Sequence, residues 1–478
     1  MKIVMAAAEC VPFVKTGGLA DVMGALPKEL VALGHEVLVI LPNYSLIPEE
    51  YKNEFSLKEE VEVPFKGGST SCKLFEYELQ GVHYMLVENE GYFARNQIYS
   101  QPDDGERFAF FNRAVLAVVE SLKEGVDILH IHDWHTAMIP FLLKEDARYA
   151  SLKGKLKTIL TIHNLQFQGW FPKSLLLEEL EMNESYFNSD AVSRNGNLNF
   201  LKSGILHADK VTTVSPAYRN EILTEQYGEK LDSLLREREP DLIGILNGLD
   251  TEVYNPAADM AIEMVYDQTS IENKAVNKRA VQSRFGLPER GDVPLLTMIS
   301  RLAGQKGIDV LQQTLPGILK TQDVQFVLLG SGESQYEQFF RELAAEFPKK
   351  VVAHIGFDES LAHLLYAGAD IFLMPSHFEP CGLSQLVSMR YGTVPVANKT
   401  GGLKDTIAEY DLILRSGNGF LSDFSKQESF AEAMNRALSL YHQPEHWKTI
   451  KQNGMQGDYS WSRSAKEYAN VYERLAGK

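Results

Sequence analysis

Short apolar runs alternate with longer helical patterns along nearly the whole chain, and no other feature of the sequence constrains the fold as strongly. Residues 3–8 predict a buried strand, residues 20–33 a helix that ends before Gly34, and residues 36–41 the next strand. Further strands are expected over 126–131, 157–162, 210–214, 242–246, 294–300, 324–329, 351–355, 371–374 and 394–397. This pattern is typical of an α/β fold in which helices cover parallel sheets.

A segment rich in Asn, Gly, Asp and Pro, residues 247–256, separates two series of strands. We therefore expect a first domain over 1–247 and a second over 248–458, with the polar, helix-like stretch 257–290 in the second. The last stretch, 459–478, is expected to return to the first domain. A length of 478 residues fits two large α/β domains as well as about three of average size.

Acidic side chains outnumber basic ones, 64 to 47, which gives a net charge of −17. This balance argues against a nucleic-acid coat and against a membrane-surface protein, because both neutralise phosphate with a broad basic field. A small anionic ligand stays possible where cations gather locally. Cys10, Cys72 and Cys381 lie far apart without CxxC spacing, which favours a reducing compartment, with the cytosol as the default, and no structural zinc site.

The first residues are apolar as far as Val14 and could be mistaken for a signal peptide. Glu9 and Pro12 interrupt the run and Lys15 follows it, so we interpret it as a buried strand. No uncharged apolar stretch of about 18 residues or more occurs elsewhere, so no membrane-spanning helix is predicted.

One pentapeptide, Lys-Thr-Gly-Gly-Leu, occurs twice, at 15–19 and at 399–403. Each copy follows a predicted strand and precedes a helical pattern, so free backbone N–H groups could bind an anion there. A tight glycine turn with no ligand explains either copy alone equally well. Two copies in two similar domains favour a function.

Polar clusters follow the predicted strands at the ends where open parallel sheets bind their ligands. They are His-Ile-His-Asp-Trp-His at 130–135, Thr-Ile-His-Asn at 161–164, Ser-Arg-Leu-Ala-Gly-Gln-Lys-Gly at 300–307 and His-Phe-Glu-Pro-Cys-Gly-Leu-Ser at 377–384. Three histidines close together suggest zinc, and alternation along a strand puts His130 and His132 on one face. No HExxH or CxxC completes such a site, so a polar loop that contacts a substrate, with Trp134 as a flat wall, is favoured.

Arg301 and Lys306 are five residues apart across a glycine-containing loop, so the two cations could converge on a diphosphate. Two solvated surface cations are the alternative. Glu379 precedes Pro380 and a helix expected to begin near Gly382, whose N–H groups could hold a phosphate. Glu379 could act catalytically or could only complement the helix dipole.

The chain contains no Asp-x-Asp pair, which often holds a divalent metal on a leaving diphosphate. Fixed cations and helix N-termini would then stabilise the leaving charge, at about 3 kcal/mol for each well-placed donor. Gly330-Ser331-Gly332 is half of a dinucleotide fingerprint, but Gln335 stands where the third glycine belongs, which weakens an NAD-binding interpretation.

These motifs, together with residues 15–22, 245–250 and 375–385, resemble bacterial glycogen synthases and the related starch synthases over essentially the whole chain. The resemblance implies a GT-B fold, in which two Rossmann-like domains face a deep cleft. It implies transfer of glucose from ADP-glucose to the non-reducing 4-hydroxyl of an α-1,4-glucan, with retention at the anomeric carbon. It also implies that no metal and no other cofactor takes part.

The resemblance assigns roles in the first domain. Lys15 and the amides of Gly17 and Gly18 would touch the donor phosphate and sugar, and Asp133 would approach the acceptor. The backbone carbonyl of His163 would face the anomeric carbon. The remaining implied substrate contacts of this domain are Asp21, Tyr99, Asn164 and Asn247.

In the second domain, Arg301 and Lys306 would clamp the diphosphate and Glu379 would bind the sugar hydroxyls. The helix start at Gly382, Leu383 and Ser384 would hold the distal phosphate, and Phe357 would cover the adenine. Further implied contacts are Gln305, Cys381, Thr400 and Gly401. Many retaining GT-B enzymes carry a second glutamate eight residues after the first to bind ribose; here that position is Val387, which puts a ribose contact there in doubt.

No carboxylate is obviously placed as a nucleophile, so a same-face displacement, with the leaving phosphate helping to deprotonate the acceptor, is the preferred mechanism. We expect donor binding to close the domains and expel water. A dinucleotide-dependent oxidoreductase and a non-catalytic sugar-nucleotide or glucan-binding protein are the competing functions, and UDP-glucose stays open as the donor. The sequence indicates no oligomeric state.

Overall fold

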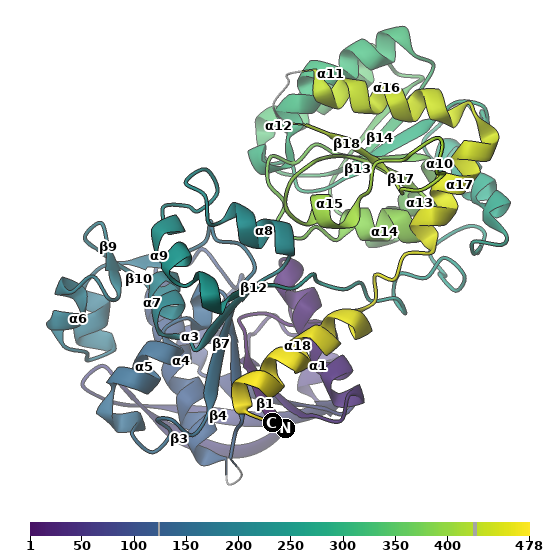
Figure 1. Ribbon diagram of the computed structural model, residues 1–478. Coiled ribbons are helices and arrows are strands. Elements are labelled where there is room, and N and C mark those ends of the chain that lie inside the picture. The colour runs from purple at the N-terminus through teal and green to yellow at the C-terminus, as the bar shows by residue number, and fades with distance from the viewer. Residues whose placement is uncertain (123–124, 424–427) are drawn as a thin grey trace. The chain divides into compact units, whose positions relative to one another are not determined.

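Two sheets built around parallel strands organise the chain, one in each of two compact units (Figure 1). The computed structural model describes residues 1–122, 125–423 and 428–478. The first unit comprises Met1–Gly248 and Trp461–Lys478, and the second comprises Leu249–Ser460.

The sheet of the first unit has the strand order β12-β11-β7-β6-β1-β2-β5-β4-β3. Its strands are β1 (Lys2–Ala6), β2 (Glu36–Pro42), β3 (Ser56–Phe65), β4 (Gly68–Leu79), β5 (Val82–Glu88), β6 (Ile128–His132), β7 (Lys157–Ile162), β11 (Lys210–Thr213) and β12 (Leu242–Gly244). The central strands β1, β6 and β7 are buried along almost their whole length and are mostly apolar, because helices cover both faces of the sheet. The predicted parallel α/β sheet is confirmed for these strands.

An antiparallel extension, β3-β4-β5, was not predicted. β3 alternates charged exposed residues with partly buried apolar ones, and β4 does the same. Such alternation is typical of an edge hairpin with one face exposed to water. These strands lack the continuous apolar run that identifies a buried strand. A second small antiparallel sheet, β8 (Trp170–Phe171), β10 (Asn197–Asn199) and β9 (Ser193–Arg194), lies in the connection after β7.

Helices of the first unit cover the sheet and fill the connections. They are α1 (Gly18–Ala32), α2 (Glu49–Lys52), α3 (Glu90–Phe93), α4 (Asp104–Ser121), α5 (Ile139–Glu145), α6 (Glu184–Asn188), α7 (Phe200–His207), α8 (Pro216–Glu221), α9 (Asp232–Glu237) and α18 (Trp461–Ala476). The last helix of the chain, α18, packs beside α1 (Figure 1). It buries Trp461, Tyr468 and Tyr472 in the first unit.

The sheet of the second unit is parallel, with the order β15-β14-β13-β16-β17-β18. Its strands are β13 (Leu295–Ile299), β14 (Gln325–Gly330), β15 (Val351–Ile355), β16 (Ile371–Met374), β17 (Val394–Asn398) and β18 (Phe420–Ser422). Its helices are α10 (Lys274–Arg284), α11 (Ile308–Thr321), α12 (Ser334–Glu346), α13 (Glu359–Gly368), α14 (Ser384–Arg390), α15 (Gly401–Thr406), α16 (Ser429–Tyr441) and α17 (Pro444–Met455). One core cluster contains residues of α11, α12 and α16, and another contains residues of α13 and α14.

Every strand predicted from the apolar runs is present, and each end lies within two residues of its predicted position. The expected helical stretch 257–290 is only partly helical: the α-helix is confined to α10, after a single 3-10 turn at Ile271–Asn273. Turns precede it, because Asn255, Asp259 and Asp267 each accept backbone N–H bonds two residues ahead, which favours turns over a helix. No helix among the described residues has the length and apolar character needed to span a membrane.

Candidate active site

Two histidine-bearing strand ends meet in the first unit, where β6 and β7 pair in parallel. His132 Nδ1 lies 3.0 Å from His163 Nε2. The backbone N–H of His163 donates to Asp133 Oδ1 at 2.7 Å. Asp133 has a φ of 56°, a left-handed conformation that is uncommon for a residue with a side chain. The turn after β6 therefore aims the Asp133 carboxylate at the start of the loop after β7.

Burial controls the protonation of His132, His163 and Asp133. It lowers the pKa of His163 to about 3 and holds the pKa of His132 well below its usual range, so both imidazoles are neutral and one donates to the other. Burial raises the pKa of Asp133 to about 7, although N–H donors from His163 and Asn164 oppose the rise. Asp133 thus titrates close to neutrality, as acids and bases in catalysis often do.

His130 belongs to a separate buried network. Its Nδ1 lies 2.7 Å from the Tyr472 hydroxyl of α18, and its Nε2 lies 2.6 Å from Thr161 Oγ1, which in turn contacts Thr212 Oγ1 at 2.6 Å. His130 and His132 share a face, with ring centroids 4.1 Å apart, as the alternation along the strand predicted. Both nitrogens of His130 are engaged in hydrogen bonds, and within the described ranges no group of three His, Cys, Asp or Glu side chains is arranged to hold a metal ion.

The first copy of the repeated pentapeptide is folded around Glu9. One carboxylate oxygen of Glu9 accepts from the Thr16 amide at 2.5 Å, the Thr16 hydroxyl at 2.9 Å and the Gly17 amide at 3.2 Å. The other oxygen accepts from the Tyr99 hydroxyl at 3.2 Å. Lys15 Nζ lies 2.6 Å from Asp21 Oδ1. The anion at the Gly17 amide is therefore the chain's own carboxylate.

Glu9 is a residue that the sequence analysis missed as a site component. It is buried, and it comes three residues after the end of β1, at the edge where the other polar clusters lie. A carboxylate in an otherwise apolar segment, eight positions before the first glycine of the pentapeptide, is the signal that could have identified it.

Aromatic rings and amides complete this end of the first unit. Tyr99 stacks on His135 at a centroid distance of 4.7 Å. The amide of Gln166 donates to Asn164 Oδ1 at 3.0 Å, so the Asn164 side chain shapes the turn after β7. Asn247 is buried at the end of the unit, and no donor in the described part of the chain lies within hydrogen-bonding reach of its Oδ1.

The corresponding edge of the second unit carries the predicted cations. Lys306 Nζ lies 2.7 Å from Glu379 Oε2, and Ser376 Oγ donates to the same oxygen at 3.0 Å. The side-chain Nε2 of Gln305 donates to the backbone carbonyl of Phe378 at 3.2 Å. The backbone carbonyl of Gln305 accepts from the His377 amide at 2.9 Å. These contacts join the loop after β13 to the loop after β16.

The other predicted residues of the second unit differ in exposure. Arg301 is exposed, and Phe357 is 83% exposed after the end of β15. Cys381 is buried, and Leu383 is half-buried. Gly382 has a φ of 72°, and α14 begins two residues later at Ser384, close to the expected helix start.

The second copy of the pentapeptide differs from the first. The Gly402 amide donates to the Glu379 carbonyl at 3.0 Å, and a Cβ at Gly402 would lie 2.0 Å from the Cys381 carbonyl oxygen. Thr400 is buried, and Gly401 has a φ of 42°. In both copies the glycines begin a helix after a loop, as predicted, but here they pack against the backbone of residues 379–381.

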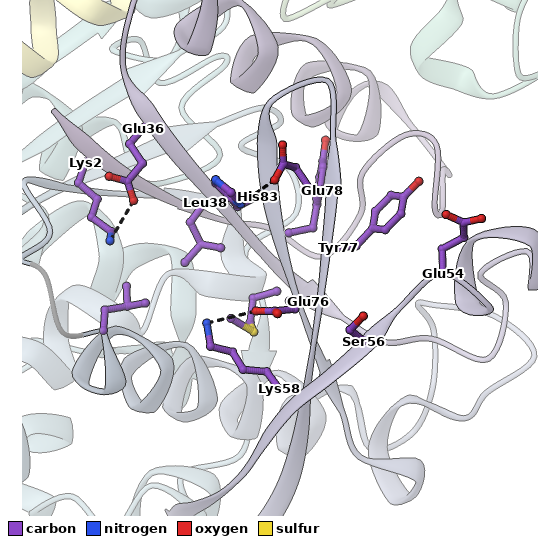
Figure 2. Close-up of a pocket in the computed structure, with 13 residues that line it drawn as sticks. Lys2, Glu36, Leu38, Glu54, Ser56, Lys58, Glu76, Tyr77, Glu78 and His83 are labelled. Atoms are coloured by element: carbon purple, nitrogen blue, oxygen red, sulfur yellow. Dashed lines mark ion pairs between the residues drawn. The ribbon is translucent and has the colours of Figure 1, made fainter.

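A hollow of about 610 Å³ lies at the other end of the first sheet (Figure 2). Lys2 and Glu36, the first residues of the parallel strands β1 and β2, line it and form an ion pair of 3.0 Å. Lys58 and Glu76 form another, of 3.4 Å. None of the predicted site residues lines this hollow, so it is separate from the strand ends described above.

Comparison with known proteins identifies the class to which this site belongs. Residues 2–237 match the family model of the starch synthase catalytic domain, and residues 281–454 match glycosyl transferases group 1. The catalytic domain of starch synthase IV from Arabidopsis thaliana, solved with ADP and acarbose, is 33% identical to this chain and superposes on it with a TM-score of 0.90. The match spans 100% of this chain and 99% of the starch synthase chain. Sucrose-phosphate synthase from Thermosynechococcus elongatus shares the fold, with 16% identity and a TM-score of 0.63. That match spans 100% of this chain and 99% of the other. The protein is a glycosyltransferase of the GT-B fold with two Rossmann-like domains.

Curated relatives narrow the family. A glycogen synthase from Bacillus cereus is 48% identical over 475 residues, 99% of this chain and 100% of the relative. One from Geobacillus thermodenitrificans is 48% identical over 478 residues, 100% of this chain and 98% of the relative. The chain belongs to the bacterial glycogen synthase family, whose enzymes transfer glucosyl units from a nucleotide-sugar donor to a glucan.

Proposed function

We propose that the protein transfers glucose from ADP-glucose to the non-reducing 4-hydroxyl of an α-1,4-glucan, with retention and without a metal ion. The ADP in the starch synthase IV structure supports the choice of nucleotide. The observation that carries the proposal is the junction of Lys306 with Glu379, two residues that the family resemblance assigns to the donor diphosphate and sugar, at the strand ends of one sheet.

The donor is proposed to bind at the strand ends of the second unit. Arg301 is exposed and free to extend its planar guanidinium toward two phosphate oxygens. Lys306 would exchange part of its contact with Glu379 for the diphosphate, while Glu379 turns toward sugar hydroxyls. Proposed contacts that complete this half are Gln305, Phe357, Cys381, Gly382, Leu383, Ser384, Thr400 and Gly401.

The acceptor and the transferred glucose are proposed to contact the first unit. Asp133 would bind the acceptor hydroxyl, because a carboxyl with a pKa of about 7 accepts or donates a hydrogen bond near neutrality. The His163 carbonyl would face the anomeric carbon, in a turn held by Asp133. The other proposed contacts are Lys15, Gly17, Gly18, Asp21, Tyr99, Asn164 and Asn247.

The proposed chemistry is a displacement on one face of the sugar. The bond from the anomeric carbon to the phosphate oxygen breaks, and its electron pair leaves with ADP. The acceptor 4-oxygen bonds to the same carbon, and its proton passes to the leaving phosphate oxygen. Trapping a glucosyl group covalently on any side chain of the protein would exclude this mechanism.

The donor is tested by incubating the protein with glycogen and each of ADP-, UDP- and GDP-glucose. Nucleotide release and polymer growth are expected with ADP-glucose, and both should depend on added glycogen. Faster transfer from UDP-glucose would overturn the donor assignment, and release without glycogen would indicate hydrolysis. Digestion of the product by an enzyme specific for α-1,4 linkages tests retention.

Metal independence has its own test. Dialysis against excess EDTA should leave the rate unchanged, because Arg301 and Lys306 supply the positive charge on the leaving group in this proposal. A rate that falls with EDTA and returns with Mg²⁺ would contradict it. The three free, buried cysteines fit the proposal that the reaction takes place in the reducing cytosol.

A further inference from the structure

Two large aromatic side chains stand exposed in the segment that begins at His163 and continues into β8. Phe167 is 55% exposed and Trp170 is 41% exposed, although exposed aromatic rings are costly to leave in water. Neither ring forms a contact with another aromatic ring of the described residues, whereas the neighbouring Phe171 packs on Trp134 and Phe200. The segment therefore turns two rings outward, while the ring of the half-buried Phe171 packs on other aromatic rings.

The backbone that carries these rings is fixed. Gln168, between them, is buried, accepts from Asn199 Nδ2 at 2.7 Å and donates to the Glu229 carbonyl at 3.0 Å. Its carbonyl and that of Gly169 accept from the amides of residues 201 and 200 at the start of α7. Rings held on such a frame lose little conformational freedom when a ligand stacks on them.

The same loop touches the candidate active site directly. A Cβ at Gly169 would lie 2.6 Å from the indole ring of Trp134, so the backbone of the loop rests on that ring. Trp134 follows Asp133, whose carboxylate binds the His163 amide. Phe167 is four residues from His163, a reach of at most about 14 Å. The exposed rings are thus continuous with the proposed acceptor end of the first unit.

The chemistry of the surface favours a carbohydrate over a protein. Gln166, a polar and exposed residue, precedes Phe167. Gly169 and the buried Gln168 separate the two rings, so the rings do not form one continuous apolar patch. An aromatic face carries partial negative charge and attracts the C–H hydrogens of a sugar ring, while an amide binds sugar hydroxyls. A glucan presents both kinds of group on every unit.

We propose that Phe167 and Trp170 form a stacking platform that binds the α-glucan acceptor beyond the unit that reacts. The inference rests on the proposed function, because it takes the glucan as the acceptor. Neither ring takes part in the chemical step; the platform holds the chain whose end is extended. It should therefore contribute more to long acceptors than to short ones.

The test uses the full-length protein with Phe167→Ala, Trp170→Ala and the double variant. The KM for maltoheptaose should rise about tenfold for each ring removed, with kcat and the KM for ADP-glucose unchanged and with a smaller effect for maltose. Phe167→Tyr and Trp170→Tyr, which keep a ring face, should restore most of the affinity. Leu57→Ala, which removes a 59% exposed side chain from β3, is the matched control and should change nothing.

Calorimetric titration with maltoheptaose, without any donor, gives a readout that does not depend on transfer. Ring-dependent binding by a protein that fails to use ADP-glucose would support the platform and refute the proposed donor. Transfer from ADP-glucose with the same maltoheptaose KM in the double variant and the wild type would overturn the platform and leave the proposed function intact. An equal loss of binding to cellohexaose, whose units are β-linked, would also overturn it. If Trp170→Ala does not fold, Phe167→Ala, whose side chain lies in a turn, decides the question.

Discussion

Lys306 Nζ lies 2.7 Å from Glu379 Oε2, and 73 residues of chain separate the two. The side chains are only 16% and 9% exposed, so water screens the pair weakly. The contact ties the loop after β13 to the loop after β16, and it holds a cation and a carboxylate in fixed positions at the proposed donor site.

Replacing Lys306 with alanine should lower kcat with ADP-glucose by about a hundredfold or more, because one fixed positive donor at a leaving group is worth about 3 kcal/mol. The unfolding free energy should fall less, by under ~2 kcal/mol, since Ser376 still donates to Glu379. Steady-state kinetics and urea unfolding measure the two effects. Lys320→Ala, which breaks an exposed ion pair with Glu346, is the control; unchanged turnover in Lys306→Ala would remove that residue from the mechanism.

Stability should fall as the pH is lowered from about 7 to 5. Burial lowers the pKa of His130, His135 and His163 to about 3 and holds the pKa of His132 well below its usual range, so these imidazoles take up protons near pH 6.5 only when the chain unfolds. Each imidazole with a pKa near 3 should lower the unfolding free energy by about 2 kcal/mol at about pH 5. The pKa of Asp133 is raised to about 7, so this carboxyl stabilises the folded protein as the pH falls. One carboxyl offsets only part of the stability that the four imidazoles lose.

Urea unfolding at several pH values measures this dependence as the number of protons taken up on unfolding. His130→Gln should reduce that number by nearly one. A stability that stays flat between about pH 7 and 5 in the wild type would show that the buried imidazoles do not control it.

The two copies of the glycine pair should respond differently to alanine. Gly402→Ala brings a Cβ within 2.0 Å of the Cys381 carbonyl, so it should lower the unfolding free energy by about 3 kcal/mol or more. Gly18→Ala meets no atom within 4 Å and should change it by no more than about 0.5 kcal/mol. Thermal or urea unfolding of the two variants tests the contrast, and equal effects would contradict the packing described for the second copy.

Tyr472→Phe should destabilise the protein by about 1–3 kcal/mol, because it leaves the buried Nδ1 of His130 without its partner. Tyr186→Phe, which removes an exposed hydrogen bond to Glu145, is the matched variant and should cost under about 0.5 kcal/mol. Chemical denaturation distinguishes them. Equal stability of Tyr472→Phe and the wild type would mean that another group satisfies His130.

The sequence predicted the central strands well because burial on both faces makes them mostly apolar, as in β1. It also predicted that polar residues would gather at the carboxyl ends of those strands. It did not predict β3, β4 or β5, because a hairpin with one solvent-exposed face lacks a long run of apolar residues.

Pairings between distant residues were beyond sequence reasoning. Glu9 accepts from Tyr99 across 90 residues, and His130 meets Tyr472 across 342. No local pattern encodes such partners, because they depend on which strands become neighbours. The motif at 15–19 indicated that an anion could bind at its amides, but not that the carboxylate of Glu9 contacts the amides of Thr16 and Gly17.

Helix α18 belongs to the first unit although it is the last helix of the chain. During synthesis the ribosome must therefore produce all of Leu249–Ser460 before the helix that covers α1 and bonds to His130 exists. A nascent first unit keeps that surface uncovered while the second unit already has its complete set of elements. The first unit is therefore the earliest part of the chain to emerge and the last to have all of its elements.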